Sequence, residues 1–191
     1  IILFNKTNKM TKQITTGKNF LFAKQSENTY EVSYNLENNR LLMAQIINTE
    51  LFKVLTEINN SNYEIYDFKI VSSSEAIIFA LIKNIFKEIT PVQQYYCFRI
   101  KLEMTNQSVN FILTPDIELG EKMLASCKAK AQHLPLREIQ NTYTLVSPHK
   151  VQFKQNIIFN DGYQLNFITE TILGMVFKMA SKKIIKFIRE L

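Results

Sequence analysis

The clearest hydrophobic pattern in the chain lies between residues 169 and 191, where apolar side chains recur at alternating steps of four and three. This spacing places them on one side of an α-helix, while the basic residues of the segment fall on the other side. The pattern therefore predicts a long amphipathic helix that must bury its apolar side. The apolar stripe comprises Leu173, Phe177, Ala180, Ile184, Phe187 and Leu191, and the basic face comprises Lys178, Lys182, Lys186 and Arg189.

Three kinds of surface could cover this stripe. The helix could pack across the protein's own sheet, or it could dock on a partner, since the four-three spacing is that of a coiled-coil seam. It could also lie on a membrane surface, because it is both amphipathic and basic. Our hypothesis is partner docking, and the binding residues would be Leu173, Phe177, Ile184, Phe187 and Leu191 with Lys178, Lys182, Lys186 and Arg189.

The rest of the chain alternates between short strand-like and helix-like patterns. Alternating or short apolar runs predict about eight strands, at 30–34, 41–47, 63–70, 96–102, 109–113, 143–146, 151–159 and 163–167. Helical spacing and capping residues predict about four helices, near 51–58, 75–89, 114–131 and 169–191. Asn160-Asp161-Gly162 predicts a tight hairpin turn. The expected fold is α+β, with a mainly antiparallel sheet in hairpins and helices on one face.

The length and composition favour one globular domain with an N-terminal appendage. The chain has 191 residues, of which 46% are hydrophobic, and only four are glycine and four proline. Residues 1–26 contain five lysines and no acidic residue, whereas residues 27–120 are net acidic. We therefore predict a basic N-terminal arm at 1–26 and a single domain at 27–191 that ends in the amphipathic helix.

The net charge of +6 is weak support for a nucleic-acid partner. Lysine far outnumbers arginine, and isoleucine and asparagine are also abundant, as an A/T-rich genome would produce. Two cysteines, Cys97 and Cys127, do not form a disulfide framework, so we expect an intracellular, reducing compartment. The cytoplasm is the expected location, and the acid-free N-terminal stretch leaves mitochondria as an alternative. No run of residues is long and apolar enough to predict a transmembrane segment.

Residues that commonly carry chemistry are few. The four glycines are too far apart for a nucleotide-binding loop. The two cysteines and two histidines lack the short paired spacing of zinc sites. Cys97 is the better candidate for a reactive thiol, because the alternation places it on a wet strand face beside Arg99 and Lys101. Asp67 interrupts an apolar strand and is expected to face solvent. We expect no catalytic residue, cofactor or metal, and therefore no enzyme.

The sequence thus favours a non-catalytic subunit of a larger assembly that contacts other protein subunits through its arm and terminal helix. The alternative is a nucleic-acid-binding accessory protein that makes non-specific phosphate contacts through a lysine-rich patch in residues 122–154. That patch would consist of Lys122, Lys128, Lys130, Arg137, Lys150 and Lys154. None of these motifs resembles that of a known family.

Overall fold

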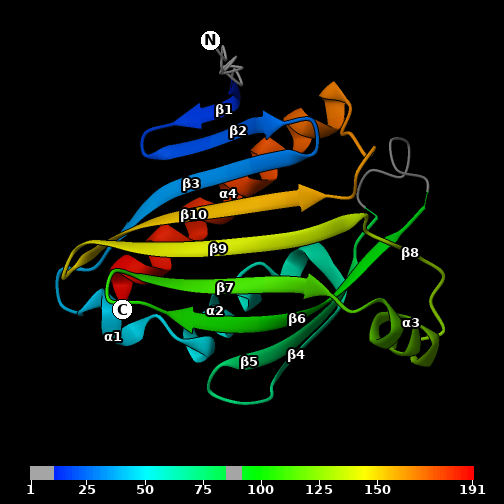
Figure 1. Cartoon of the computed structure of the whole chain (residues 1–191), viewed down its shortest axis with the longest axis horizontal. Helices are drawn as coiled ribbons and strands as arrows, with labels where there is room; N and C mark the ends of the chain where they lie inside the picture. The colour runs from blue at the N-terminus through cyan, green and yellow to red at the C-terminus, as the bar shows by residue number, and fades with distance from the viewer. Residues whose placement is uncertain (1–10, 85–91) are drawn as a thin grey trace, which may run out of the picture.

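The structure is a computed structural model that describes residues 11–84 and 92–191. Within these ranges, one sheet runs in the order β1-β2-β3-β10-β9-β7-β6-β5-β4, and the short β8 pairs with β6 (Figure 1). All pairs are antiparallel except that between β8 and β6. The strands are β1 (Lys12–Gly17), β2 (Phe20–Ser26), β3 (Thr29–Glu37), β4 (Tyr63–Ile70), β5 (Glu75–Ile82), β6 (Gln94–Met104), β7 (Ser108–Pro115), β8 (Gln132–His133), β9 (Leu136–Ser147) and β10 (Lys150–Phe159).

Three of the helices begin at a side-chain cap that satisfies a free backbone amide of the first turn. Asn48 caps α2, Asp116 caps α3 and Asn166 caps α4, and each accepts a hydrogen bond from the amide three residues further on. The predicted α+β fold with a mainly antiparallel sheet and a long amphipathic C-terminal helix is confirmed. The helices are α1 (Met43–Ile46), α2 (Thr49–Glu57), α3 (Ile117–Ser126) and α4 (Phe167–Glu190), with a 3-10 turn η1 (Asn60–Asn62).

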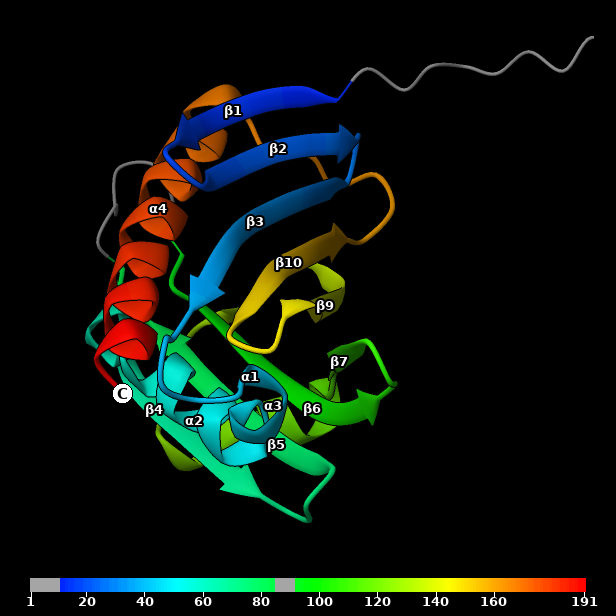
Figure 2. The ribbon, with the colours of Figure 1, turned by 90° about the vertical axis from the view of Figure 1, so that its left-hand side faces the viewer.

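One face of the sheet, here called the inner face, packs against α4 and α2. Figure 2 shows α4 alongside β1, β2 and β3 on this side of the curved sheet. The ring of Phe177 on α4 lies 5.4 Å from that of Phe22 on β2. Phe52 on α2 stacks on Phe111 of β7 with a centroid distance of 4.4 Å. The main hydrophobic core therefore lies between the inner face and these two helices.

The strand register places a continuous row of side chains across the inner face. Phe22 lies opposite Val32, Val32 opposite Gln155, Gln155 opposite Asn141, and Asn141 opposite Phe111. Directly opposed residues of an antiparallel sheet project to the same face. The row therefore crosses the sheet from the part covered by α4 to the part covered by α2.

The opposite face, the outer face, has its own smaller core under α3. Phe79 and Leu81 of β5 and Tyr95 and Cys97 of β6 pack there against apolar side chains of α3 and the segment after it. The close approach depends on Gly120, because a Cβ on it would lie 2.9 Å from the Tyr95 ring. Strands β5 and β6 are thus covered on both faces.

The predicted helix at 75–89 is wrong for the residues that the structure describes, because residues 75–82 form strand β5. Ile78 and Ala80 face the main core, while Phe79 and Leu81 face α3. A strand buried on both faces has a nearly continuous apolar sequence and loses the alternation that would identify it. Residues 85–89 of the expected helix lie outside the described residues.

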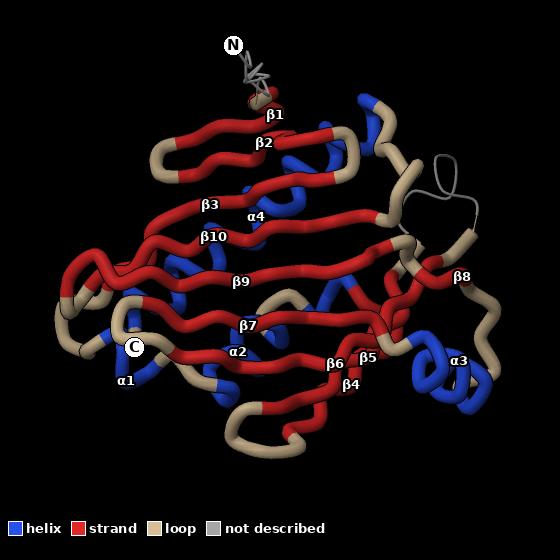
Figure 3. Tube along the Cα trace, viewed as in Figure 1, coloured by secondary structure: helices blue, strands red, loops and turns tan. Residues whose placement is uncertain are grey.

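Three further predictions differ from the structure. Residues 12–26 form β1 and β2 at the edge of the sheet, where an arm was expected, and residues 1–10 lie outside the described residues. The expected strand at 41–47 contains the short helix α1. No hairpin follows Gly162, whose φ is +79°; residues 160–166 form a loop that leads into α4 (Figure 3).

Candidate functional site

Two neutral amide side chains lie at the centre of the inner face. Asn141 of β9 and Gln155 of β10 are directly opposed in the antiparallel register. Asn141 is only 3% exposed, and its Oδ1 atom has no hydrogen-bond partner. Buried polar atoms nearly always have a partner, and an unsatisfied one costs about 1–3 kcal/mol. This amide is therefore the strongest sign of a ligand contact in the described part of the chain.

The residues around the two amides are apolar or aromatic. Phe111 and Val32 lie beside them in the same row, and Ile139 and Ile157 form the next row along the strands. All four side chains belong to the main core or pack against it. A molecule that contacts Asn141 would consequently be surrounded mostly by hydrocarbon.

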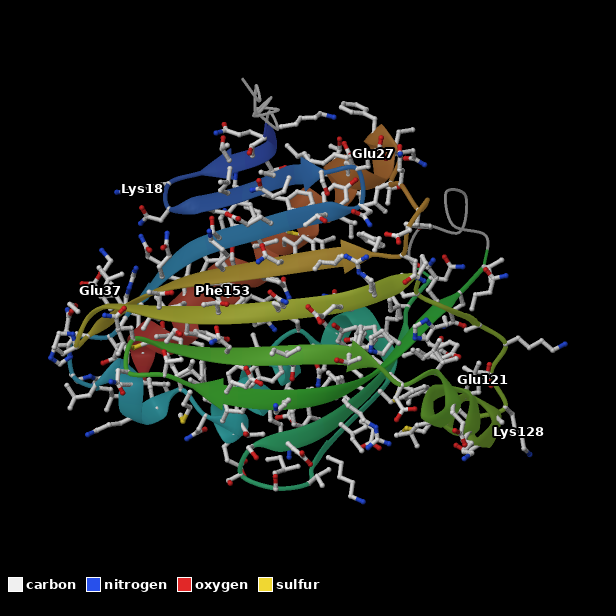
Figure 4. All side chains as sticks on the ribbon, in the orientation of Figure 1. Lys18, Glu27, Glu37, Glu121, Lys128 and Phe153 are labelled. Carbon is white, nitrogen blue, oxygen red and sulfur yellow. The ribbon has the colours of Figure 1, made fainter. Side chains whose placement is uncertain are left out.

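The row on the other side of the amides contains Tyr34, Phe153 and Tyr143. The ring of Phe153, which Figure 4 labels on β10, lies 4.6 Å from that of Tyr34 and 4.9 Å from that of Tyr143. Burial raises the pKa of the Tyr143 hydroxyl, and burial together with the nearby Tyr143 raises that of Tyr34. Both hydroxyls therefore remain protonated and uncharged at neutral pH.

The centre of the inner face is not completely enclosed. Helix α4 packs on β3, β1 and β2, and α2 packs on β4, so β9 and β10 lie between the two helices. Gln155 and Ile139 retain partial solvent exposure although they point inward from central strands. Accessible surface therefore remains on the inner face beside Asn141.

Three tyrosines extend the inner face toward β4. Tyr66 and Tyr96 occupy the same cross-strand row through Ala80, and Tyr63 stacks on Tyr66 at a centroid distance of 5.6 Å. The Tyr66 hydroxyl contacts that of Thr56 on α2. Burial raises the pKa of Tyr66 to about 12, so this hydroxyl is also neutral. This end of the inner face offers aromatic surface with uncharged polar groups.

The one fully buried acidic residue among the described residues, Glu170, is already satisfied. Its carboxylate accepts hydrogen bonds from the Tyr30 hydroxyl at 2.8 Å, Lys12 at 3.0 Å and Lys24 at 3.1 Å. Burial by itself would raise the pKa of Glu170, but the hydrogen bonds from Tyr30, Lys12 and Lys24 outweigh it and the pKa is lowered. This cluster fixes the first turn of α4 to β1, β2 and β3.

The residues predicted to bind a partner lie along α4 in two environments. Leu173, Phe177, Ile184 and Phe187 pack against the main core, whereas Leu191 is 43% exposed. This is the arrangement in which the stripe packs across the protein's own sheet. The basic residues differ as well: Lys178 donates a 2.7 Å hydrogen bond to the backbone oxygen of Thr16, and Lys182, Lys186 and Arg189 are exposed.

The residues predicted to bind nucleic acid do not form one patch. Lys122 of α3 lies 2.6 Å from Glu118, and Lys128 and Lys130 follow α3 at one end of the sheet. Lys150 opens β10 opposite Glu37, at the other end; Figure 4 labels Glu37 and Lys128 at these two ends. The two remaining residues pair with acids, Arg137 with Asp161 at 3.2 Å and Lys154 with Glu31 at 3.4 Å.

The other candidate residues from the sequence also have clear positions. Cys97 was expected on a wet face but is completely buried under α3, and burial with Asp116 nearby raises its pKa to about 11. Cys127 and Asp67 are exposed.

Within the described ranges, no three His, Cys, Asp or Glu side chains are grouped so that they could share a metal ion. None of the helices there has both the length and the apolar character needed to cross a bilayer.

The fold matches solved structures although the sequence does not match known families. No protein-family model and no curated protein matches the chain. The human StarD13 (DLC2) lipid transfer and protein localization domain superposes with a TM-score of 0.67 at 9% identity, over 96% of this chain and 91% of that one. A STAR-related lipid transfer protein from Xanthomonas axonopodis superposes with a TM-score of 0.60 at 10% identity, over 91% of this chain and 98% of that one. Human StAR-related lipid transfer protein 5 superposes with a TM-score of 0.59 at 8% identity, over 97% of this chain and 87% of that one.

These matches correct the function that the sequence favoured. The prediction of a structural subunit with other protein subunits as partners is wrong, and so is the alternative of a nucleic-acid-binding protein. The finding that overturns both is the fold, which the chain shares over nearly its whole length with lipid-transfer domains. The chain has the helix-grip fold of these domains, in which a curved antiparallel sheet packs around a long C-terminal helix.

Proposed function

We propose that this protein binds a lipid between the inner face of its sheet and the helices α4 and α2. The observation that carries the proposal is the unpartnered amide of Asn141, which lies in an apolar face that still has accessible surface. Such an amide is costly in an empty apolar interior, but a ligand that hydrogen-bonds to it would remove that cost. The fold shared with lipid-transfer domains supports the same function.

The composition of the inner face suits an amphiphile. Each methylene group that moves from water to an apolar surface gains about 0.8 kcal/mol, so a long hydrocarbon chain gains enough to bind tightly. Phe111, Val32, Ile139 and Ile157 provide apolar surface around the amides, and the tyrosines toward β4 provide more. The function needs no reacting group. That the chain is not an enzyme, and that it is intracellular, both stay predictions.

Binding can be tested directly with fluorescent lipids. The purified chain is titrated into NBD-labelled cholesterol, ceramide and phosphatidylcholine, and the expected result is saturable, blue-shifted emission with at least one probe at one molecule per chain. Transfer is then measured as movement of that probe from donor to acceptor vesicles. If a folded, monodisperse protein gave no saturable signal with any of the three probes, the proposal would be wrong.

A pair of substitutions on one strand localises the binding. Ile139 points to the inner face and Gln140, the next residue of β9, points to the outer face. Ile139→Trp should fill space at the inner face and abolish probe binding, whereas Gln140→Trp should leave binding unchanged. Equal binding by both variants would place the ligand elsewhere on the protein.

A further inference from the structure

The environment of Asn141 also indicates which class of lipid the protein accepts. We infer that Asn141 and Gln155 bind the polar end of the ligand and that this end is uncharged, such as the hydroxyl or carbonyl of a single-headed lipid. This inference rests on the proposed function, because it names the substrate class of the same site. It excludes lipids whose polar end is a phosphate, sulfate or carboxylate.

The two amides form a neutral hydrogen-bonding pair that suits a hydroxyl. Directly opposed residues in an antiparallel sheet have Cβ atoms about 4.5–5.5 Å apart, so one ligand atom can contact both side chains. Each amide offers an acceptor oxygen and two N–H donors, and a hydroxyl both donates and accepts. A hydroxyl at this position could donate to Oδ1 of Asn141, which lacks a partner, and accept from Gln155.

The absence of charge near the pair is the second part of the argument. In the described sheet, the inward positions of β3, β10, β9 and β7 are occupied by uncharged side chains. The buried carboxylate of Glu170 binds the ammonium groups of Lys12 and Lys24. This cluster lies at the edge of the sheet that α4 covers. The inward residues are Tyr30, Val32, Tyr34 and Leu36 on β3, and Val151, Phe153, Gln155 and Ile157 on β10. On β9 they are Ile139, Asn141, Tyr143 and Leu145, and on β7 they are Val109, Phe111 and Leu113.

A charged polar end would therefore be buried without a counter-ion. An ion moved out of water loses several kcal/mol of solvation unless an opposite charge and hydrogen bonds compensate it. A neutral hydroxyl or carbonyl loses far less and is fully compensated by one or two hydrogen bonds. The tyrosines at 34 and 143 lie on the same face beside the amides and also supply only uncharged groups.

Competition between chain-matched ligands tests the inference. The competitors are 1-hexadecanol, hexadecyl sulfate and hexadecane. The affinity of each is measured by how well it displaces the NBD-labelled lipid that binds best. We expect 1-hexadecanol to bind at least tenfold more tightly than hexadecyl sulfate. Asn141→Leu should weaken 1-hexadecanol about 3- to 10-fold, as expected for one lost hydrogen bond, and leave hexadecane unchanged. Thr142→Leu, on the outer face of the same strand, is the matched control and should change neither.

Folding of the variant is checked in the same experiment. Asn141→Leu replaces an unsatisfied buried amide, so the ligand-free variant should unfold at the same temperature as the wild type or higher. Tighter binding of hexadecyl sulfate than of 1-hexadecanol would overturn the inference, and so would an unchanged 1-hexadecanol affinity in Asn141→Leu. In either case, continued binding of hexadecane would leave the proposed function intact. If 1-hexadecanol did not displace a bound probe, the inference would be wrong and the proposed function would stand; only the absence of saturable probe binding would refute the proposed function.

Discussion

The hydroxyl of Tyr30 donates a 2.8 Å hydrogen bond to Oε1 of Glu170 and thereby joins the third strand of the chain to the first turn of its last helix. Lys12 and Lys24 reach the same carboxylate from β1 and β2. At the other end of α4, Asn38 donates a 2.7 Å hydrogen bond to the backbone oxygen of Ile188, which has no partner within the helix. Both ends of the helix that covers the inner face are therefore fixed by buried side chains.

The first prediction concerns the Tyr30 hydroxyl. Tyr30→Phe keeps the ring, which is 1% exposed, and removes one hydrogen bond to a charged group. Such bonds contribute roughly 1.5–3 kcal/mol, so the free energy of unfolding in urea should fall by about that amount. Tyr163→Phe is the control, because Tyr163 is only partly buried and stacks on Phe159 nearby; it should change stability by less than about 0.5 kcal/mol. An equal fall in the free energy of unfolding in the two variants would show that the hydrogen bond to Glu170 does not contribute the expected stability.

The second prediction concerns the pH dependence of stability. The pKa of Glu170 is lower in the folded than in the unfolded protein, so its contribution is fully present above the unfolded pKa of about 4.3. As the pH falls through the folded pKa, the carboxylate takes up a proton and the contribution is lost. Glu170→Gln should therefore be less stable than wild type at pH 7, and the difference should shrink below about pH 4. Urea unfolding at pH 7, 5 and 3.5 measures this, and a difference that stayed constant or grew on acidification would contradict it.

The sequence predicts those elements best whose pattern is set by one buried face. The stripe from Leu173 to Phe187 is buried on one side only, so its helical spacing is clear, and the helix was expected within two residues of its true start. Strand β5 has two buried faces, and its apolar run fits a helix as well as a strand. Cys97 was predicted to face solvent for the same reason. The alternation in β6 indicates an exposed face there, but α3 covers that face.

The candidate site could not be found from the sequence. Asn141 lies before the strand predicted at 143–146, although β9 already begins at Leu136. Gln155 is one of several polar residues in β10, and only the strand register shows that it faces inward opposite Asn141. The unsatisfied state of an amide is a property of its neighbours in space, so no local pattern could reveal it. The fold class required only periodicity, whereas the site required the pairing of distant strands.

The third prediction separates the two cysteines by reactivity. Cys97 is completely buried, and burial raises its pKa to about 11, so almost no thiolate is present or accessible near neutral pH. Cys127 is exposed. DTNB should therefore titrate one thiol rapidly in the native protein at pH 8 and two in guanidinium. Cys127→Ser should remove the rapid phase, whereas Cys97→Ser should keep it. A rapid reaction of two thiols in the folded protein would contradict the placement of α3 over Cys97.

The fourth prediction concerns the contact between α4 and the edge of the sheet at Gly174. A Cβ at this position would lie 2.2 Å from Oγ1 of Thr15 and 3.1 Å from the ring of Phe22, so α4 would have to move away from β1 and β2. In an exposed helix, Gly→Ala stabilises by roughly 1 kcal/mol, but overpacking typically costs 1–3 kcal/mol. Gly174→Ala should therefore lower the free energy of unfolding by about 1–2 kcal/mol.

A double-mutant cycle identifies the cause of that loss. Thr15→Gly removes both atoms of Thr15 that a new Cβ would meet and leaves only the 3.1 Å approach to Phe22, so Gly174→Ala should cost clearly less in that background. Met179→Ala, at a site on α4 that is 60% exposed, should have little effect in either background. The free energies of unfolding of the four proteins in urea give the coupling between positions 15 and 174. If Gly174→Ala were as stable as wild type while Thr15 is present, the close approach of helix and sheet would not require glycine at this position.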